Sequence, residues 1–245
     1  MKENQPLRNI NRVITMKKYN KIKKILFAAI CGGLFIACQQ PHNVNDPLQV
    51  LCLGNSITKH PIKEDIEWFS DWGMAASNIE YDYCHQLEKM LCKYHPNSTV
   101  TPLNIASWER NLSCDIDSLI GSYCKNKDII IIRLGENVQD VTTFPDAISR
   151  LVKYCQSKAK RVIITGCFWK NDSKELSIIH AARTNDLTYV PLYWIDNLYN
   201  VRPQIGDTLY DINKKPYVIT QDFIITHPND EGMQMIAETI WGVIR

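Results

Sequence analysis

Three short apolar runs constrain the fold of this chain more than any other feature. They read LQVLCLG at residues 48–54, DIIIIRLG at 128–135 and RVIITGC at 161–167. Their hydrophobicity is continuous rather than alternating, which is typical of parallel strands covered on both faces. Weaker strand candidates are STVTPLNIA at 98–106 and LTYVPLYW at 187–194. The pattern therefore predicts a mainly parallel sheet of five strands.

Helix-like segments separate these runs, at residues 80–94, 113–124, 144–158, 172–184 and 231–244. The last has apolar residues at helical spacing, and Asn229 or Asp230 is placed to cap it. Alternating strands and helices predict βαβ units and an α/β fold. With 245 residues, of which 45% are hydrophobic, the chain can bury one substantial core. One domain over residues 48–245 is the prediction.

Polar residues follow several of the predicted strands at the point where each ends. Asn55 and Ser56 follow the first strand, residues 104–110 follow the second, and Glu136 and Asn137 follow the third. Open α/β sheets bind ligands beyond the carboxyl ends of their strands. These groups, together with His227 just before the last helix, are expected to meet at that edge.

The residue types fit nucleophilic catalysis. A serine hydroxyl needs a base to take its proton, and the tetrahedral intermediate needs donors aimed at its oxyanion. Ser56 would supply a hydroxyl and a backbone N–H, His227 the base, and Asn137 an amide donor. Each residue also has an ordinary interpretation: Ser56 as a helix N-cap, Asn137 as a turn cap, and His227 as a solvated loop residue.

The segments GNSIT, LGEN and HPNDEG, in this order before a closing amphipathic helix, resemble the SGNH or GDSL-type hydrolases. The resemblance covers residues 48–245 and implies a flavodoxin-like, three-layer α/β/α sandwich with a mainly parallel five-stranded sheet. It implies Ser56 as nucleophile, His227 as base and Asn137 as oxyanion donor, with the Ser56 N–H. The stretch at 71–87 and the following NIASWERN also resemble a subgroup of bacterial envelope lipoproteins.

The chain departs from the family pattern in its second block. Where the family offers a glycine N–H to the oxyanion, this chain reads Asn104-Ile105-Ala106-Ser107. A positive φ would strain a non-glycine residue there. An altered loop is expected, with Ala106 or Ser107 as the backbone donor.

The second departure concerns the orienting carboxylate of the histidine, because Ile224 stands where the family has an aspartate. Asp222 would reach His227 if the loop bends, and a backbone carbonyl is the other candidate for the Nδ1 hydrogen bond. Glu109 and Glu136 are more distant candidates. The site is either a triad completed by Asp222 or a Ser–His dyad.

Residues 1–37 have the order of a secretory signal. The basic stretch MKKYNKIKK precedes the apolar run ILFAAICGGLFIA, and Cys38 follows Ala37. This order resembles a bacterial lipoprotein signal and implies lipidation of Cys38, with residues 38–47 as a polar tether. The alternative is an ordinary secretory signal with an incidental cysteine. The expected location is the bacterial cell envelope, on the periplasmic or cell-surface side.

Composition and motifs exclude several other classes. Residues 38–245 hold 20 basic and 25 acidic residues, which argues against a nucleic-acid surface. The seven cysteines after Cys38 lack the spacing of a metal knuckle. Their odd number also argues against a disulfide framework. Neither a zinc motif nor a phosphate-binding glycine motif occurs. No metal and no cofactor are predicted.

Residues 193–217 hold five aromatic side chains, which would either stack on sugar rings or lie half-buried under a long loop. The resemblance to SGNH hydrolases, together with the expected envelope location, implies an esterase that removes acetyl or other short acyl groups from carbohydrate. The alternative is a noncatalytic glycan-binding lipoprotein with a degenerate SGNH site.

Overall fold

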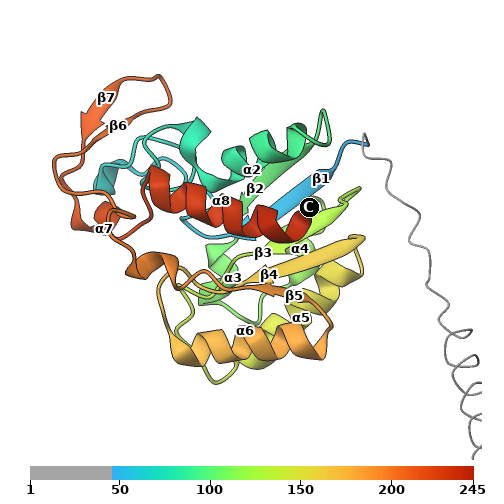
Figure 1. The fold of residues 1–245 in the computed structure, drawn as a ribbon. Coiled ribbons are helices and arrows are strands. Elements are labelled where there is room, and N and C mark those ends of the chain that lie inside the picture. Colours follow the sequence, from blue (N-terminus) through green and yellow to red (C-terminus); the bar gives the residue numbers. More distant parts are fainter. Residues whose placement is uncertain (1–45) are drawn as a thin grey trace, which may run out of the picture. The chain divides into compact units, whose positions relative to one another are not determined.

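The central sheet contains five strands in the order β2-β1-β3-β4-β5, and all of its pairs are parallel. The structure, a computed structural model, describes residues 46–245 (Figure 1). The strands are β1 (Gln49–Gly54), β2 (Thr99–Asn104), β3 (Ile129–Ile132), β4 (Arg161–Thr165) and β5 (Thr188–Val190). All five lie within the ranges predicted from the apolar runs, and the strand order is the flavodoxin-like one.

Helices cover both faces of this sheet, so the three-layer α/β/α prediction is confirmed (Figure 1). On one face lie α2 (Tyr83–Cys92) and α8 (Asp230–Ile244); on the other lie α5 (Phe144–Gln156) and α6 (Asp172–Thr184).

The side chains of successive strand residues point alternately into the apolar cores on the two faces of the sheet. This explains why the strands are continuously hydrophobic. Val50 and Cys52 pack with residues of α2 and α8, whereas Leu51 and Leu53 pack with residues of α5. All four side chains are fully buried, and burying a leucine or valine contributes about 1.5–3 kcal/mol. Of the seven cysteines in residues 46–245, five are buried, as expected for small apolar side chains.

Capping side chains set the starts of the helices. Asn171 accepts a hydrogen bond from Lys174 N and begins α6 at its predicted first residue. Asn229 accepts one from Gly232 N and begins α8, so Asn229 is the cap of the predicted pair. The helix α4 (Ile116–Ile120) is shorter than the predicted 113–124, because Asp115 caps it late and turns follow from Gly121.

Several short elements were not predicted, because each is too short to show a periodic pattern. They are the helices α3 (Ala106–Arg110) and α7 (Asp222–Ile225), the hairpin strands β6 (Thr208–Tyr210) and β7 (Pro216–Val218), and the 3₁₀ turns η1 (Glu64–Ile66), η2 (Ile79–Tyr81) and η3 (Ile195–Asn197). The hairpin replaces part of the predicted long loop and is antiparallel. Its Tyr210 N–H donates to Ser77 O, and its Tyr217 ring packs against Phe69.

The predicted signal at residues 1–37, the lipidation site Cys38 and most of the tether at 38–47 lie outside the described residues. Within residues 46–245, no helix has the length and apolar character needed to cross a membrane.

Replacing Gly54 by alanine is expected to destabilise the fold by about 1–3 kcal/mol, the usual range for overpacking. An added Cβ would lie 1.8 Å from Thr58 Oγ1 and 2.6 Å from Thr58 Cβ. Thr58 is fully buried and hydrogen-bonded to Tyr83, so it has little room to move. Urea unfolding would measure the loss.

The matched control is Gly242→Ala in α8, where an added Cβ meets nothing within 4 Å. Because alanine favours a helix more than glycine does, this variant should be unchanged or up to about 1 kcal/mol more stable. A Gly54→Ala protein as stable as wild type would contradict the tight β1 turn described here.

Candidate active site

Ser56 lies in the turn that leaves β1. Thr58 N and Lys59 N both donate to Asn55 O, at 2.9 and 3.0 Å, and Met74 N donates to Ser56 O at 2.8 Å. These bonds hold the turn closed while Ser56 itself is only half-buried between buried neighbours. Within residues 46–245 the Ser56 N–H has no hydrogen-bond partner. The turn therefore leaves both the hydroxyl and the N–H of one residue available.

His227 meets this serine from the other end of the chain. Its Nε2 lies 2.8 Å from Ser56 Oγ, across 171 positions of sequence. The imidazole is fully buried, and it stands just before the Asn229 cap of α8. The structure thus brings together the predicted nucleophile and base.

The Nδ1 atom of His227 contacts a backbone carbonyl. It lies 3.0 Å from Phe223 O and 3.2 Å from Thr226 Oγ1, which also bonds Phe223 O. Because a carbonyl oxygen only accepts, the Nδ1 atom must carry the proton. Nε2 of the neutral ring is then the acceptor for the Ser56 hydroxyl.

Asp222 does not take the position of the missing carboxylate. It is exposed at the start of α7, and its carboxylate is not among the hydrogen-bond partners of His227. Of the candidates left open by the sequence, the backbone carbonyl is the one that contacts Nδ1. Ile224, at the family's aspartate position, is fully buried in the core instead.

Two aromatic rings flank the imidazole, and neither was predicted. The ring centroids of Trp169 and Phe223 lie 5.3 and 5.1 Å from that of His227, both edge to face. Trp169 Nε1 also donates to Thr226 O at 2.9 Å. The aromatic residues predicted at 193–217 are not those in contact with His227. Trp169 follows β4 in sequence, so its position at the carboxyl edge was the available signal.

Burial lowers the pKa of His227 from 6.5 to about 3, because the charged ring would lose its hydration. The Phe223 carbonyl opposes this shift, and the positive charge of Arg133 adds to it. The imidazole is therefore neutral near pH 7, the state in which Nε2 can accept a proton.

Asn137 lies after β3 and is tied to a buried glutamate. Its side-chain Nδ2 donates to Glu109 Oε2 at 2.6 Å, and its backbone N–H donates to Glu109 Oε1 at 3.2 Å. Glu109 Oε1 also accepts from Asn55 Nδ2, at 3.3 Å. The carboxylate thus joins the loop of Asn137 to the turn of Ser56.

A second buried glutamate completes this polar network. Glu136 Oε2 accepts from Asn55 Nδ2 at 2.7 Å, and Glu136 Oε1 forms an ion pair with Arg133. Arg133 Nη1 donates to Asn55 Oδ1 at 2.9 Å. Glu109 and Glu136, distant candidates for the partner of His227, contact the asparagines and Arg133 rather than the imidazole.

The loop after β2 offers one free backbone donor. Ala106 N donates to Asn104 Oδ1 at 2.9 Å, whereas the Ser107 N–H has no partner within residues 46–245. Neither residue has a positive φ, so the strain expected from the missing glycine is avoided. The loop instead starts the short helix α3, which explains why no glycine is needed.

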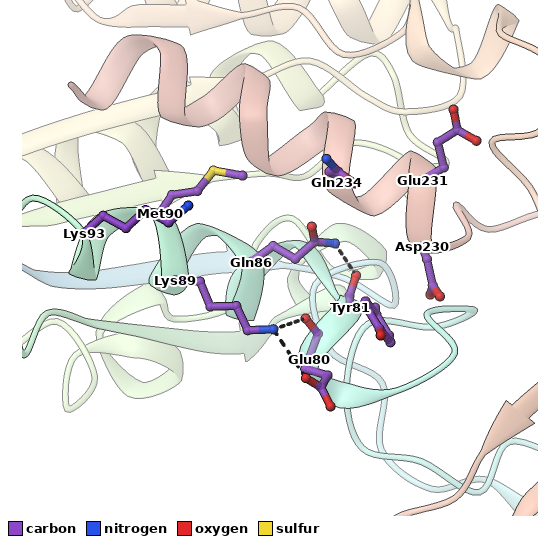
Figure 2. A pocket seen from close by; sticks show the side chains of 9 residues that line it. All are labelled: Glu80, Tyr81, Gln86, Lys89, Met90, Lys93, Asp230, Glu231 and Gln234. Carbon is purple, nitrogen blue, oxygen red and sulfur yellow. Dashed lines mark hydrogen bonds and ion pairs between the residues drawn. The ribbon is translucent and has the colours of Figure 1, made fainter.

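The cavity in Figure 2 lies elsewhere, between α2 and α8. It measures about 390 Å³ and is lined by Glu80, Tyr81, Gln86, Lys89, Met90, Lys93, Asp230, Glu231 and Gln234. It contains none of the predicted site residues. A second hollow of about 570 Å³ lies beside Glu109, between residues 109–113 and 139–150. In the part of the chain that the structure describes, no group of three His, Cys, Asp or Glu side chains could hold a metal ion.

Known structures with the same fold include several esterases. LAE5, an α/β hydrolase enzyme from the metagenome of Lake Arreo, superposes with a TM-score of 0.55 at 13% identity, over 81% of this chain and 95% of that one. Axe2, an acetylxylan esterase from Geobacillus stearothermophilus, gives 0.53 at 13% identity, over 81% and 94%.

A two-domain esterase (CEX) active on acetylated mannans gives a TM-score of 0.55 at 18% identity, over 82% of this chain and 50% of that one. At these identities the likeness establishes the α/β fold. No protein-family model and no curated protein matches the sequence.

Acid should destabilise the protein partly through His227. Its pKa is about 3 when folded and near 6.5 when unfolded, so below pH 6.5 the unfolded chain binds a proton that the folded chain does not. The titration of His227 therefore leaves the free energy of unfolding at its full value above pH 6.5. As the pH falls toward 3, it lowers this free energy by up to about 1.4 kcal/mol per pH unit. Urea unfolding at several pH values would measure this.

The variant His227→Gln separates this contribution from those of other groups. Its stability should fall less steeply between pH 6.5 and 4 than that of wild type. Equal slopes for the two proteins would mean that the folded imidazole titrates normally.

Proposed function

We propose that this protein is a serine ester hydrolase of the SGNH or GDSL type. The observation that carries the proposal is the 2.8 Å contact between Ser56 Oγ and a neutral, buried His227 Nε2. Its support includes the free Ser56 N–H at the carboxyl edge of the sheet and a fold shared with esterases.

In the first step, Ser56 Oγ attacks the ester carbonyl carbon while His227 Nε2 takes the hydroxyl proton. The C=O electron pair moves to the carbonyl oxygen, whose negative charge is met by the Ser56 N–H and by an Asn137 amide N–H. The Ser107 N–H is the third candidate donor. When the intermediate collapses, the C–O bond to the alcohol breaks and His227 returns the proton to that oxygen.

In the second step, water replaces the alcohol. His227 Nε2 takes a proton from water, the hydroxide oxygen attacks the acyl-serine carbonyl, and the Ser56 ester bond then breaks. The proton returns to Ser56 Oγ, and the acyl group leaves as a carboxylic acid. The enzyme is regenerated without a cofactor.

This catalysis would rest on a dyad. The Phe223 carbonyl holds the tautomer that the reaction needs, a role that an aspartate fills in the Ser-His-Asp arrangement. A carbonyl dipole stabilises the imidazolium less than a carboxylate charge does. In the free protein, burial lowers the pKa of His227, and the hydrogen bond to the Phe223 carbonyl opposes this shift only in part.

The proposed substrates are acetylated or otherwise short-acylated carbohydrates. Axe2 is described as an acetylxylan esterase and CEX as active on acetylated mannans, and both share this fold. The excess of acidic over basic residues in 38–245 suits a neutral glycan better than a polyanion. The proposed location is the cell envelope, through a lipid anchor on Cys38.

The anchor predicts a change in partitioning. When the full chain is produced in an exporting bacterium, wild type should enter the detergent phase on Triton X-114 separation, and Cys38→Ala should stay in the aqueous phase. Cys31→Ala, which changes the other cysteine of the signal, should behave as wild type. A Cys38→Ala protein that still enters the detergent phase, with an unmodified Cys38 peptide in wild type, would contradict lipidation.

Turnover of p-nitrophenyl acetate by the full-length protein tests the mechanism. Ser56→Ala should abolish it, and Asn137→Ala should reduce it by about 10²–10³-fold, the usual effect of losing an oxyanion donor. Asp222→Asn should leave turnover near wild type, because that carboxylate does not contact the imidazole.

Ser157→Ala, at the far end of α5, is the matched serine control. Turnover that survives Ser56→Ala would remove this serine from the mechanism. Absence of turnover in wild type, on acetylated xylan and mannan oligosaccharides as well, would favour the alternative of a noncatalytic glycan-binding protein.

A further inference from the structure

Glu109 is the most heavily hydrogen-bonded buried charge near the site, and the reaction above does not use it. Its side chain is on α3 and is 1% exposed. It accepts bonds from Gly135 N at 2.6 Å, Asn137 N at 3.2 Å, Asn55 Nδ2 at 3.3 Å and Asn137 Nδ2 at 2.6 Å. One carboxylate therefore holds both the backbone and the side chain of Asn137.

These bonds fix the direction of the Asn137 carboxamide. The amide nitrogen has two N–H groups, and one of them points to Glu109 Oε2. Within residues 46–245, no other hydrogen bond of this side chain occurs, so the second N–H is left without a protein partner. A half-buried amide held on one side by a carboxylate cannot turn freely, and its second N–H keeps one direction.

The same carboxylate also shapes the loop that carries Asn137. Gly135 has a φ of +136°, a conformation that favours glycine, and an added Cβ would lie 2.6 Å from Cys167 Sγ. Its N–H ends on Glu109 Oε1. Glu109 therefore holds the loop backbone as well as the side-chain amide of Asn137.

A purely structural role would not require a charge at this position. Burying a carboxylate is costly, and here both burial and the neighbouring Glu136 raise the pKa of Glu109. Arg133 forms its ion pair with Glu136 rather than with Glu109. What Glu109 provides, and an apolar residue would not, is two acceptor oxygens aimed at one asparagine.

We infer that Glu109 is the positioning residue of the oxyanion hole: it orients the Asn137 carboxamide so that one N–H remains aimed at the reacting carbonyl. The inference rests on the proposed esterase function. It means that the buried carboxylate of this site acts through the oxyanion donor rather than through the histidine.

The test uses Glu109→Gln in the full-length protein. Oε1 accepts hydrogen bonds from three N–H groups, so the glutamine oxygen is expected to stay at that position and the new Nε2 to replace Oε2. Nε2 would then face Asn137 Nδ2, and two N–H donors cannot bond to each other. The amide must then turn its oxygen toward residue 109. For p-nitrophenyl acetate, kcat is expected to fall about 10–10²-fold with KM nearly unchanged, since an oxyanion donor acts in the transition state.

The matched control is Glu175→Gln. Glu175 is another buried glutamate near the same edge, and it accepts from Cys167 N and Tyr189 Oη but does not contact Asn137. It should lose stability without a comparable loss of kcat. Thermal melting of each variant separates misfolding from a loss of positioning.

A double-mutant cycle decides between positioning and general support. If Glu109 acts through Asn137, Glu109→Gln should lower kcat little further in an Asn137→Ala background. Equal losses in both backgrounds, or no loss in the single variant while Ser56→Ala is inactive, would overturn the inference and leave the esterase function standing.

The side-chain amide signals of Asn137 in ¹H–¹⁵N NMR give a measurement that does not depend on turnover or on a variant. In wild type, one of the two protons should be shifted downfield and should exchange slowly with solvent. Two protons that both have the ordinary shifts of a solvated asparagine amide and both exchange fast would overturn the inference. A protein that shows the expected signals and yet has no esterase activity would keep the positioning contact and lose the proposed function.

Discussion

Parallel strand register is the constraint on which the site depends. Gly54 pairs with Asn104, and Leu53 pairs with Ile132, so β1, β2 and β3 end side by side. Neighbouring strands lie about 4.8 Å apart, which places the three following loops within reach of one another. Ser56, Glu109 and Asn137 are therefore brought together by the apolar pairing that forms the core. The pairing of β1, β2 and β3 is therefore sufficient to bring the three loops that follow these strands together.

The histidine reaches this edge by a different route. The helix α8 packs on α2 through the core on one face of the sheet, and the Asn229 cap fixes where that helix begins. His227 precedes the cap by two residues, so its position follows from the helix start. In the Ser-His-Asp arrangement, loss of the aspartate costs about 10⁴ in turnover, largely through the wrong tautomer. In the proposed dyad, the Phe223 carbonyl keeps the tautomer protonated on Nδ1, so the missing aspartate would affect only the stabilisation of the imidazolium charge.

The parts predictable from the sequence were those with long or strongly patterned segments. The five strands, α6 and the Ser56–His227 pair belong to this group, because continuous apolar runs and strand-end polar residues carry a clear signal. The partner of Nδ1 could not be chosen, since any residue supplies a carbonyl and only the four-residue helix α7 aims that of Phe223. The contact of Glu109 with Asn137 could not be predicted for a similar reason, since α3 is too short to show a pattern; from the sequence, Glu109 was only a distant candidate for the partner of His227.

The electrostatics of the proposed oxyanion hole follow from these contacts. Neutral donors, the N–H groups of Ser56 and Asn137, stand at the surface of the site, whereas Arg133, Glu136 and Glu109 lie buried behind them. Dipoles held by buried charges need not reorient when an oxyanion forms, which is the condition for preorganised stabilisation. A carboxylate beside the reacting carbonyl would repel the oxyanion. Placed behind the amide, it can instead fix the direction of the donor, and the intervening carboxamide keeps its charge away from the reaction.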